Sequence, residues 1–379
     1  QTQCADVMRR LGLEFSEGQG TLSVTPPSWR FDLQIEEDLI EEVIRVIGYP
    51  QLPAVPPLAP VTARVLPESG RSAFAVRRAL AALDYQETIN FSFVESRWEH
   101  ELAGNLDPIK VLNPIAAPLA VMRSSLIGSL IAVQRFNLAR KAARVRVFEL
   151  GRVFRRDPRV QEGDRSVAGI AQPMRVAALA GGSAVPQQWG DKERAVDFFD
   201  AKGDVEALLA PRLPVFVADS HPALHPGRCA RIELDGLAIG FVGELHPKWR
   251  LAYELPQAPM LFELDLEAVL RTPVPAFEPI PRQQAVTRDL ALVLADAVTH
   301  DALTAALLDD AAGLIRTATL FDIYRPAAPA PGLMAGERSL AVRLELLDAD
   351  STLTDERIDA AVAAALARVS SALGGRLRA

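Results

Sequence analysis

The sequence has 379 residues, with 41 lysines and arginines against 48 aspartates and glutamates, and a formal net charge of −7. This balance excludes a globally basic protein that coats nucleic acid, but it does not exclude a local basic face. Hydrophobic residues make up 49% and charged residues 23%, which is typical of a globular protein with a sizeable core, and the length predicts two or three domains.

Cysteine and membrane signals are both weak. Cys4 and Cys229 lie far apart, which predicts neither a disulfide framework nor a zinc site and favours a reducing cytoplasm. The longest uncharged stretch, residues 46–63, contains five prolines, so we expect no membrane span. The chain starts without an initiator methionine and directly on a helical pattern, so we expect a fragment of a larger protein.

Proline clusters at residues 50–67 and 256–281 divide the chain into three segments. The first, residues 1–50, predicts a helix that ends at Gly12, an extended stretch over 21–25, and a second helix that stops near Gly48. We expect this segment to be the end of a small, acidic, winged-helix-like domain rather than a complete domain.

The second segment, residues 67–270, alternates between helical and strand patterns. Helices are predicted over residues 71–83 and 124–142. Strands are predicted over residues 144–148, 175–180, 230–234, 238–242 and 259–264. Strands that are joined by turns and flanked by helices indicate an α+β domain built on an antiparallel sheet.

The third segment, residues 278–378, has the clearest pattern. Strands are predicted over residues 287–294, 314–324, 338–347 and 376–378, and helices over 299–310 and from 354 to the glycine pair at 374–375. The order is strand, helix, strand, strand, helix, strand, which predicts a ferredoxin-like fold. That fold supports many functions, so the order alone assigns none.

Six carboxylates fall within residues 32–42, with no basic residue among them: Asp32, Glu36, Glu37, Asp38, Glu41 and Glu42. On a helix, Asp38, Glu41 and Glu42 share one face. Hard oxygen ligands of this kind suit Mg²⁺ or Ca²⁺. The alternative is an acidic first turn that is favoured by the helix dipole and solvated.

A basic run gives a local charge of about +7, and a patch of that density can neutralise phosphates. Ion pairs on a solvated surface are the alternative. The run comprises Arg135, Arg140, Lys141, Arg144, Arg146, Arg152, Arg155, Arg156 and Arg159, relieved by Glu149 and Asp157. No catalytic motif accompanies it. His221 and His225 are four residues apart, but Pro222 and Pro226 would break the helix that could bring them together as metal ligands.

Aromatic residues beside arginines on a sheet can stack RNA bases while the arginines hold the backbone. Phe321 and Tyr324 lie near the end of a predicted strand, and Arg288, Arg325 and Arg343 belong to the same predicted sheet. We expect Phe321 to pack in the core, whereas Tyr324, next to a Pro/Gly loop, is as compatible with exposure as with burial.

The first segment then shows a specific pattern. Residues 24–32 read VTPPSWRFD, residues 37–43 read EDLIEEV and residues 47–49 read IGY, which resembles a signature of the bacterial phenylalanyl-tRNA synthetase beta-subunit family. The resemblance implies that Asp32, Asp38, Glu41 and Glu42 bind a Mg²⁺ ion shared with the alpha subunit.

The middle segment resembles the catalytic-like, class II synthetase domain of that family. The motifs are NFSF at 90–93, LNP at 112–114, MRSSL at 122–126, VFELGRVF at 147–154, HPGR at 225–228 and VGELHP at 242–247. Arg146 and Glu149 resemble the Arg-x-Glu pair that grips ATP in active class II cores, but the Gly-rich third motif is absent. The resemblance therefore implies that this domain lacks catalytic motifs and that ATP is bound by the alpha subunit.

The last segment resembles the ferredoxin-fold anticodon-binding domain. Its motifs are TRDLA at 287–291, FDIY at 321–324, RSLA at 338–341, TLTD at 352–355 and LGGRLR at 373–378. The resemblance implies that Tyr324 stacks on the anticodon, and we expect Arg288 and Arg343 to contact tRNA as well. One departure from the family is the Ala/Pro-rich loop at residues 326–331.

Together these resemblances imply part of a cytoplasmic alpha2beta2 ligase that attaches phenylalanine to tRNA(Phe) with ATP. The chain would scaffold the catalytic alpha subunit and bind the anticodon. The N-terminal tRNA-binding and editing domains of the family are missing from it. Two alternatives are an independently active class II ligase and a protein scaffold that does not contact RNA.

Overall fold

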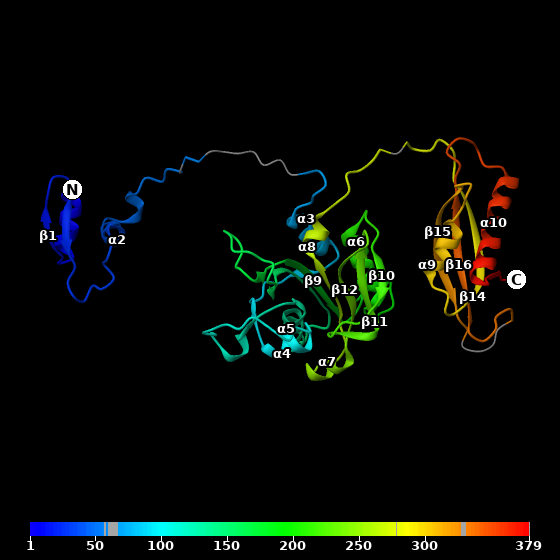
Figure 1. Cartoon of the computed structure of the whole chain (residues 1–379), viewed down its shortest axis with the longest axis horizontal. Helices are drawn as coiled ribbons and strands as arrows, with labels where there is room; N and C mark the ends of the chain where they lie inside the picture. The colour runs from blue at the N-terminus through cyan, green and yellow to red at the C-terminus, as the bar shows by residue number, and fades with distance from the viewer. Residues whose placement is uncertain (57, 60–66, 278, 327–330, 379) are drawn as a thin grey trace. The chain divides into compact units, whose positions relative to one another are not determined.

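The computed structural model describes residues 1–56, 58–59, 67–277, 279–326 and 331–378 (Figure 1). The chain separates into two compact units, Gln1–Arg77 and Arg78–Ala379. The proline-rich stretch 50–67 and the loop 326–331 lie partly outside the described residues.

The first unit is built on a helix, a hairpin and a second helix. Its elements are α1 (Thr2–Arg10), β1 (Glu14–Glu17), β2 (Leu22–Thr25), α2 (Glu36–Ile47) and the 3-10 turn η1 (Tyr49–Gln51). Met8, Leu13 and Leu33 form its small buried core, against which Leu39 and Val43 of α2 pack. Both helices and the extended stretch agree with the sequence pattern, while β1 was not predicted.

Seven strands form the large sheet, in the order β10-β11-β12-β13-β9-β6-β3. All pairs are antiparallel except β3 with β6. The strands are β3 (Gln86–Glu87), β6 (Val145–Arg152), β9 (Met174–Gly181), β10 (Val215–Ala218), β11 (Leu224–Leu234), β12 (Leu237–Leu245) and β13 (Met260–Asp265). The antiparallel sheet that the sequence predicts is confirmed, and β11 starts six residues earlier than expected.

Helices flank this sheet. They are α3 (Ala73–Ala82), α4 (Ser96–Glu101), α5 (Ile127–Leu138), α6 (Phe198–Leu209), α7 (Pro247–Ala252) and α8 (Leu266–Leu270). Short elements complete the domain: η2 (Ala117–Leu119) and the pairs β4 (Phe93–Val94) with β5 (Val121–Met122) and β7 (Arg155–Arg156) with β8 (Ile170–Ala171). The apolar residues of α5 join those of β6 and β9 in one core, whereas α6 contacts β12 and β13.

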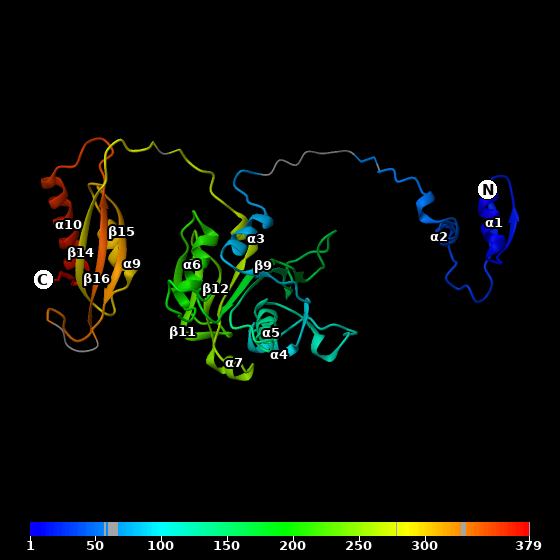
Figure 2. The ribbon, with the colours of Figure 1, turned by 180° about the vertical axis from the view of Figure 1, so that it is seen from behind.

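The C-terminal part has the ferredoxin-like topology that the sequence predicts. Its elements are β14 (Val286–Ala295), α9 (His300–Leu308), β15 (Ile315–Tyr324), β16 (Glu337–Leu346), α10 (Asp355–Leu373) and β17 (Arg376–Leu377). The sheet order is β15-β16-β14-β17, with every pair antiparallel. Figures 1 and 2 show α10 running along this sheet, and α9 and α10 share one core with the strands.

Among the described residues, no helix is long and apolar enough to cross a membrane.

Candidate functional site

The ferredoxin-like sheet leaves one face free of helices. Leu340, Val342 and Leu344 of β16 point into the helix-covered core, so the alternate residues point to the opposite, open face. On that side Arg343 is exposed, whereas Ser339 is buried. Helices cannot cover both faces of this sheet because α9 and α10 pack on the same core. The open face is therefore available to a ligand.

Phe321 lies on this open face, because the register of β15 shifts between Leu320 and Asp322. Its side chain is 54% exposed, and the Arg343 guanidinium carbon lies 5.5 Å from its ring centroid. The prediction that Phe321 packs in the core is therefore wrong. A local bulge, which alternation along a strand does not reveal, turned it outward.

Tyr324 pairs with Ser339 of β16 and so shares the open face. It is 38% exposed, and the Arg378 guanidinium carbon lies 4.4 Å from its ring centroid. Arg378 was not singled out in the sequence. It reaches this face because its backbone N–H donates to the Ala291 carbonyl, 2.7 Å away, which extends the pairing of β17 with β14.

The two arginines expected beside Tyr324 lie in different places. Arg343 is on the open face, where it makes two hydrogen bonds to Asp289, 2.7 and 2.8 Å long, and this pairing lowers the pKa of the Asp289 carboxyl. Arg288 falls on the same side of β14 as Leu290 and points toward α10, with its Nη2 3.8 Å from Asp355. The structure thus brings Tyr324 and Arg343 to one face and leaves Arg288 off it.

The acidic cluster lies at the start of α2 and just before it, and three of the four expected metal ligands already have partners. Asp38 accepts hydrogen bonds from the backbone N–H groups of Gln34 and Ile35, 2.8 and 3.0 Å long; these two bonds lower its pKa and cap the helix. Asp32 and Glu42 are both bound by Arg30. Glu41 is exposed, and no interaction is recorded for it among the described residues.

The acidic cluster was expected to bind a metal ion. In the part of the chain that the structure describes, no group of three acidic, histidine or cysteine side chains is arranged to hold one. Arg30 bridges Asp32 and Glu42, with Nη2 2.8 Å and 2.9 Å from their oxygens, and so neutralises the acids without a metal. The carboxylate donors fit Mg²⁺ by their chemistry, but Arg30 competes for two of them.

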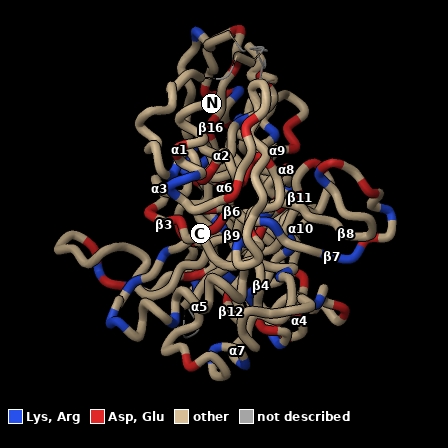
Figure 3. Tube along the Cα trace, turned by 90° about the vertical axis from the view of Figure 1, so that its left-hand side faces the viewer, with Lys and Arg blue, Asp and Glu red and all other residues tan. Residues whose placement is uncertain are grey.

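Five of the nine basic residues in the run form ion pairs within their own domain. Arg144 and Arg146 pair with Asp84 and Asp204. The other pairs are Arg156 with Asp107, 3.0 Å, Arg159 with Asp157, 2.9 Å, and Arg135 with Glu254, 3.8 Å. Figure 3 likewise shows basic and acidic positions interspersed along the trace. This pairing favours the ion-pair interpretation of the run over a phosphate-binding patch.

Arg146 and Glu149 do not form the pair that the sequence suggested. They are three residues apart in β6, so they point to opposite faces of the sheet. Arg146 binds Asp204 and lies over the Tyr85 ring, 4.3 Å from its centroid. Glu149 instead binds Arg123, with Nη2 2.8 Å from Oε1.

The Arg123–Glu149 pair is buried deep in the synthetase-like domain. The two residues are 2% and 3% exposed. Asn90 donates a hydrogen bond of 2.8 Å to Glu149, and Arg123 donates one of 3.0 Å to the Arg152 carbonyl. A carboxylate held in this way has no free approach for a nucleotide. Sequence spacing could not reveal the pair, because Arg123 comes from a distant loop.

His221 and His225 each accept a backbone hydrogen bond from a residue two positions later in the chain. The Nδ1 of His221 accepts the Ala223 N–H at 3.2 Å, and that of His225 accepts the Gly227 N–H at 2.9 Å. Burial, and to a lesser extent Arg155, lowers the pKa of His221 to about 4. The His221 ring is therefore neutral near pH 7, and it stabilises its own loop through the hydrogen bond from Ala223.

An antiparallel sheet followed by a ferredoxin-like domain with an open, aromatic-bearing face agrees with the tRNA-synthetase component that the sequence resembles. Three family descriptions match in sequence order: "tRNA synthetase B5 domain" over residues 1–49, "Phenylalanyl tRNA synthetase beta chain CLM domain" over 52–266 and "Ferredoxin-fold anticodon binding domain" over 281–378. The chain belongs to the phenylalanyl-tRNA synthetase beta chain family.

Curated relatives agree with this assignment. Proteins described as "Phenylalanine--tRNA ligase beta subunit" are 52% identical over 99% of this chain in Ralstonia nicotianae and 50% identical over 99% in Cupriavidus pinatubonensis. The chain spans only 47% of the length of each. Among solved structures, a pyrrolysyl tRNA synthetase of Desulfitobacterium hafniense aligns with 52% of the chain and 65% of its own, at 12% identity and a TM-score of 0.37, too low for an argument about fold.

Proposed function

We propose that this chain is the part of a phenylalanine–tRNA ligase beta subunit that scaffolds the catalytic alpha subunit and binds the anticodon of tRNA(Phe). The complete enzyme would be a cytoplasmic alpha2beta2 heterotetramer that attaches phenylalanine to tRNA with ATP. We propose domain limits of 1–50 for the alpha-contacting segment, 67–270 for the catalytic-like domain and 278–378 for the anticodon-binding domain. The tRNA-binding and editing domains would belong to the other half of the subunit.

The observation that carries this proposal is the open face of the ferredoxin-like sheet. It presents two aromatic rings, Phe321 and Tyr324, each with an arginine beside it. Aromatic rings offer stacking surfaces to unpaired bases, and arginines bind phosphates or stack on bases themselves. Of the three residues first expected to contact RNA, Tyr324 and Arg343 fit this face, whereas Arg288 points to the helix-covered side of the sheet.

The catalytic-like domain supports a role without chemistry. An independently active ligase would need Glu149 to reach ATP, yet this carboxylate is buried and paired with Arg123. We therefore place ATP binding in the alpha subunit, and we expect the isolated chain to consume no ATP. ATP turnover by the purified chain with phenylalanine would argue for the independent ligase instead.

The metal role is proposed for Asp32, Asp38, Glu41 and Glu42, with the ion shared between the subunits. When bound, Mg²⁺ would supply the positive charge that lets acids of both subunits approach one another. In this chain Asp38 keeps its role as helix cap, while Glu41 offers a carboxylate with no competing partner. Arg30 would have to release Asp32, and both Arg30 and Arg45 would have to release Glu42, for these to join.

Glu41→Gln therefore gives the cleanest test of the metal proposal. The substitution removes a charge that no described residue uses, so we expect normal folding and weaker binding to the alpha subunit in Mg²⁺. In EDTA the wild type and the variant should bind equally. Light scattering of the chain mixed with its cognate alpha subunit measures both the affinity and the mass of the complex.

Glu37→Gln is the matched control, since Glu37 lies on the same helix, is exposed and is not among the proposed ligands. It should bind the alpha subunit as the wild type does. Equal binding to the alpha subunit by all three proteins, with and without EDTA, would show that Mg²⁺ does not contribute to the subunit contact. A mass that corresponds to two copies of each chain would support the heterotetramer.

A further inference from the structure

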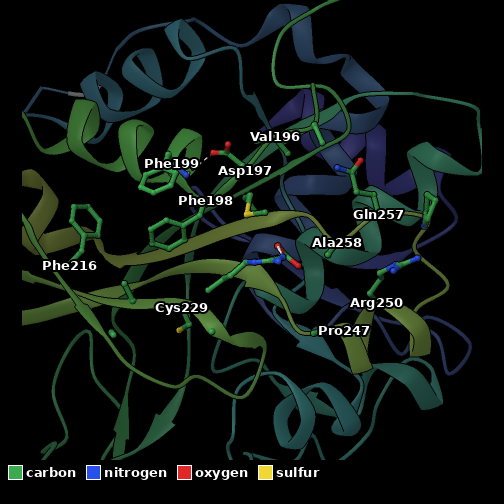
Figure 4. A pocket seen from close by; sticks show the side chains of 18 residues that line it. Val196, Asp197, Phe198, Phe199, Phe216, Cys229, Pro247, Arg250, Gln257 and Ala258 are labelled. Atoms are coloured by element: carbon green, nitrogen blue, oxygen red, sulfur yellow. Dashed lines mark hydrogen bonds and ion pairs between the residues drawn. The ribbon is translucent and has the colours of Figure 1, made fainter. Parts of the chain in front are cut away.

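A second site lies in the synthetase-like domain. A cavity of about 830 Å³ opens between the start of α6, the strands β10 to β13 and α7 (Figure 4). Small-molecule sites typically enclose a few hundred to about 1,000 Å³, so this volume is sufficient for an organic ligand. Two segments that the sequence singled out, residues 225–228 and 242–247, contribute to its lining, and the proposed function uses neither.

One side of the cavity is aromatic. Figure 4 shows Phe198, Phe199 and Phe216 gathered together. The rings of Phe198 and Phe199 meet edge to face, with centroids 5.8 Å apart, and Phe199 is 75% exposed. An exposed aromatic ring in a concave site contributes free energy when a ligand covers it, because apolar surface leaves water.

The other side is polar and carries hydrogen-bond donors that no described residue engages. Figure 4 shows Arg250 and Gln257 away from the phenylalanines. Arg250 donates through Nε to the Leu255 carbonyl, 3.2 Å away, and no other partner of its guanidinium is found among the described residues. The lining also holds Arg228, which donates one bond of 2.5 Å to Glu244.

The acids of the lining are already engaged. Asp197 accepts the backbone N–H groups of Phe199 and Asp200 at the start of α6, and Glu244 accepts Arg228. The groups that remain open to a ligand are therefore guanidinium donors of the exposed Arg228 and Arg250, which bind carboxylates through strong charge-assisted hydrogen bonds. The arginines and the aromatic side of the cavity together favour an anion that also carries an apolar group.

We propose that this cavity binds a small carboxylic acid that carries an aromatic or bulky apolar group. The apolar group lies against Phe198, Phe199 and Phe216, and the carboxylate binds the arginines on the polar side. This proposal does not rest on the anticodon or alpha-subunit assignments, so its failure would leave the proposed function unaffected.

The test uses the purified chain and three probes in ligand-observed NMR titrations: 3-phenylpropanoate, 2-phenylethylamine and acetate. 3-Phenylpropanoate should saturate and bind at least tenfold more tightly than the amine, which lacks the carboxylate. Acetate, which lacks the apolar group, should not saturate at the same concentrations. Stronger binding of the amine, or no saturation by 3-phenylpropanoate, would overturn the proposal.

Variants locate the site. Phe216→Ala and Arg250→Gln should each weaken 3-phenylpropanoate binding at least fivefold, and Arg271→Gln, an exposed arginine outside the cavity that pairs with Glu267, should leave it unchanged. Because Arg250 also holds the Leu255 carbonyl, Arg228→Gln serves as a second cation variant if Arg250→Gln fails to fold. Unchanged affinity in the folded variants would place any binding elsewhere and overturn the assignment.

Discussion

Replacing Arg123 by methionine is expected to destabilise the synthetase-like domain by about 3–5 kcal/mol, the usual cost of leaving one partner of a buried ion pair alone. Arg123 and Glu149 are almost completely buried and 2.8 Å apart. Methionine fills a similar volume, but it leaves the Glu149 carboxylate without its charge partner and the Arg152 carbonyl without its donor. Urea unfolding followed by circular dichroism measures the loss.

Two variants control this experiment. Arg156→Gln breaks the pair with Asp107, whose side chains are 53% and 78% exposed, and should change stability by less than about 1 kcal/mol. The double variant Arg123→Met/Glu149→Leu removes both charges and should be more stable than Arg123→Met alone. If Arg123→Met costs less than about 1 kcal/mol, the pair is not what holds this loop against the sheet.

Replacing Tyr324 by alanine is expected to weaken tRNA(Phe) binding by about 1–3 kcal/mol, or roughly 5- to 150-fold, the range for one stacked base. One face of the Tyr324 ring is occupied by Arg378, 4.4 Å from the centroid. A base would therefore stack on the other face or displace the arginine. Fluorescence anisotropy with labelled tRNA(Phe) at fixed salt measures the change.

Tyr324→Phe is the matched control, since it keeps the ring and removes only the hydroxyl. It should retain nearly the whole affinity if stacking is the main contribution. An unchanged affinity of Tyr324→Ala for tRNA(Phe) would contradict the anticodon assignment and favour a scaffold that does not contact RNA. A large loss in both variants would mean that the hydroxyl, rather than the ring, makes the contact.

The ferredoxin-like domain could be predicted from the sequence because local signals agree there. Its strands alternate apolar and polar residues, Thr299 caps α9 through its side chain, and Gly374 ends α10 in the left-handed conformation with φ of 65°. The start of β11 was missed because Pro226 and Gly227 suggest a turn, whereas the strand accommodates them in a register shift between Leu224 and Cys229.

The candidate sites were less predictable because they depend on contacts between distant residues. The acids of α2 share a helix face, as their spacing indicated, but the bridge from Arg30 to Glu42 requires the fold of the preceding loop. The partner of Glu149 comes from a loop 26 residues earlier in the chain. Arg378 reaches Tyr324 only because β17 pairs with β14. No local pattern encodes such pairs.

The most direct test of the proposed anticodon role uses an isolated RNA. The anticodon stem-loop of tRNA(Phe) and a stem-loop with the same stem but a different anticodon are titrated against the purified chain at equal salt concentration. We expect the first to bind at least tenfold more tightly, since base stacking and edge contacts act only on the loop. Equal affinity for both would show charge-driven binding alone and contradict the assignment of the open face.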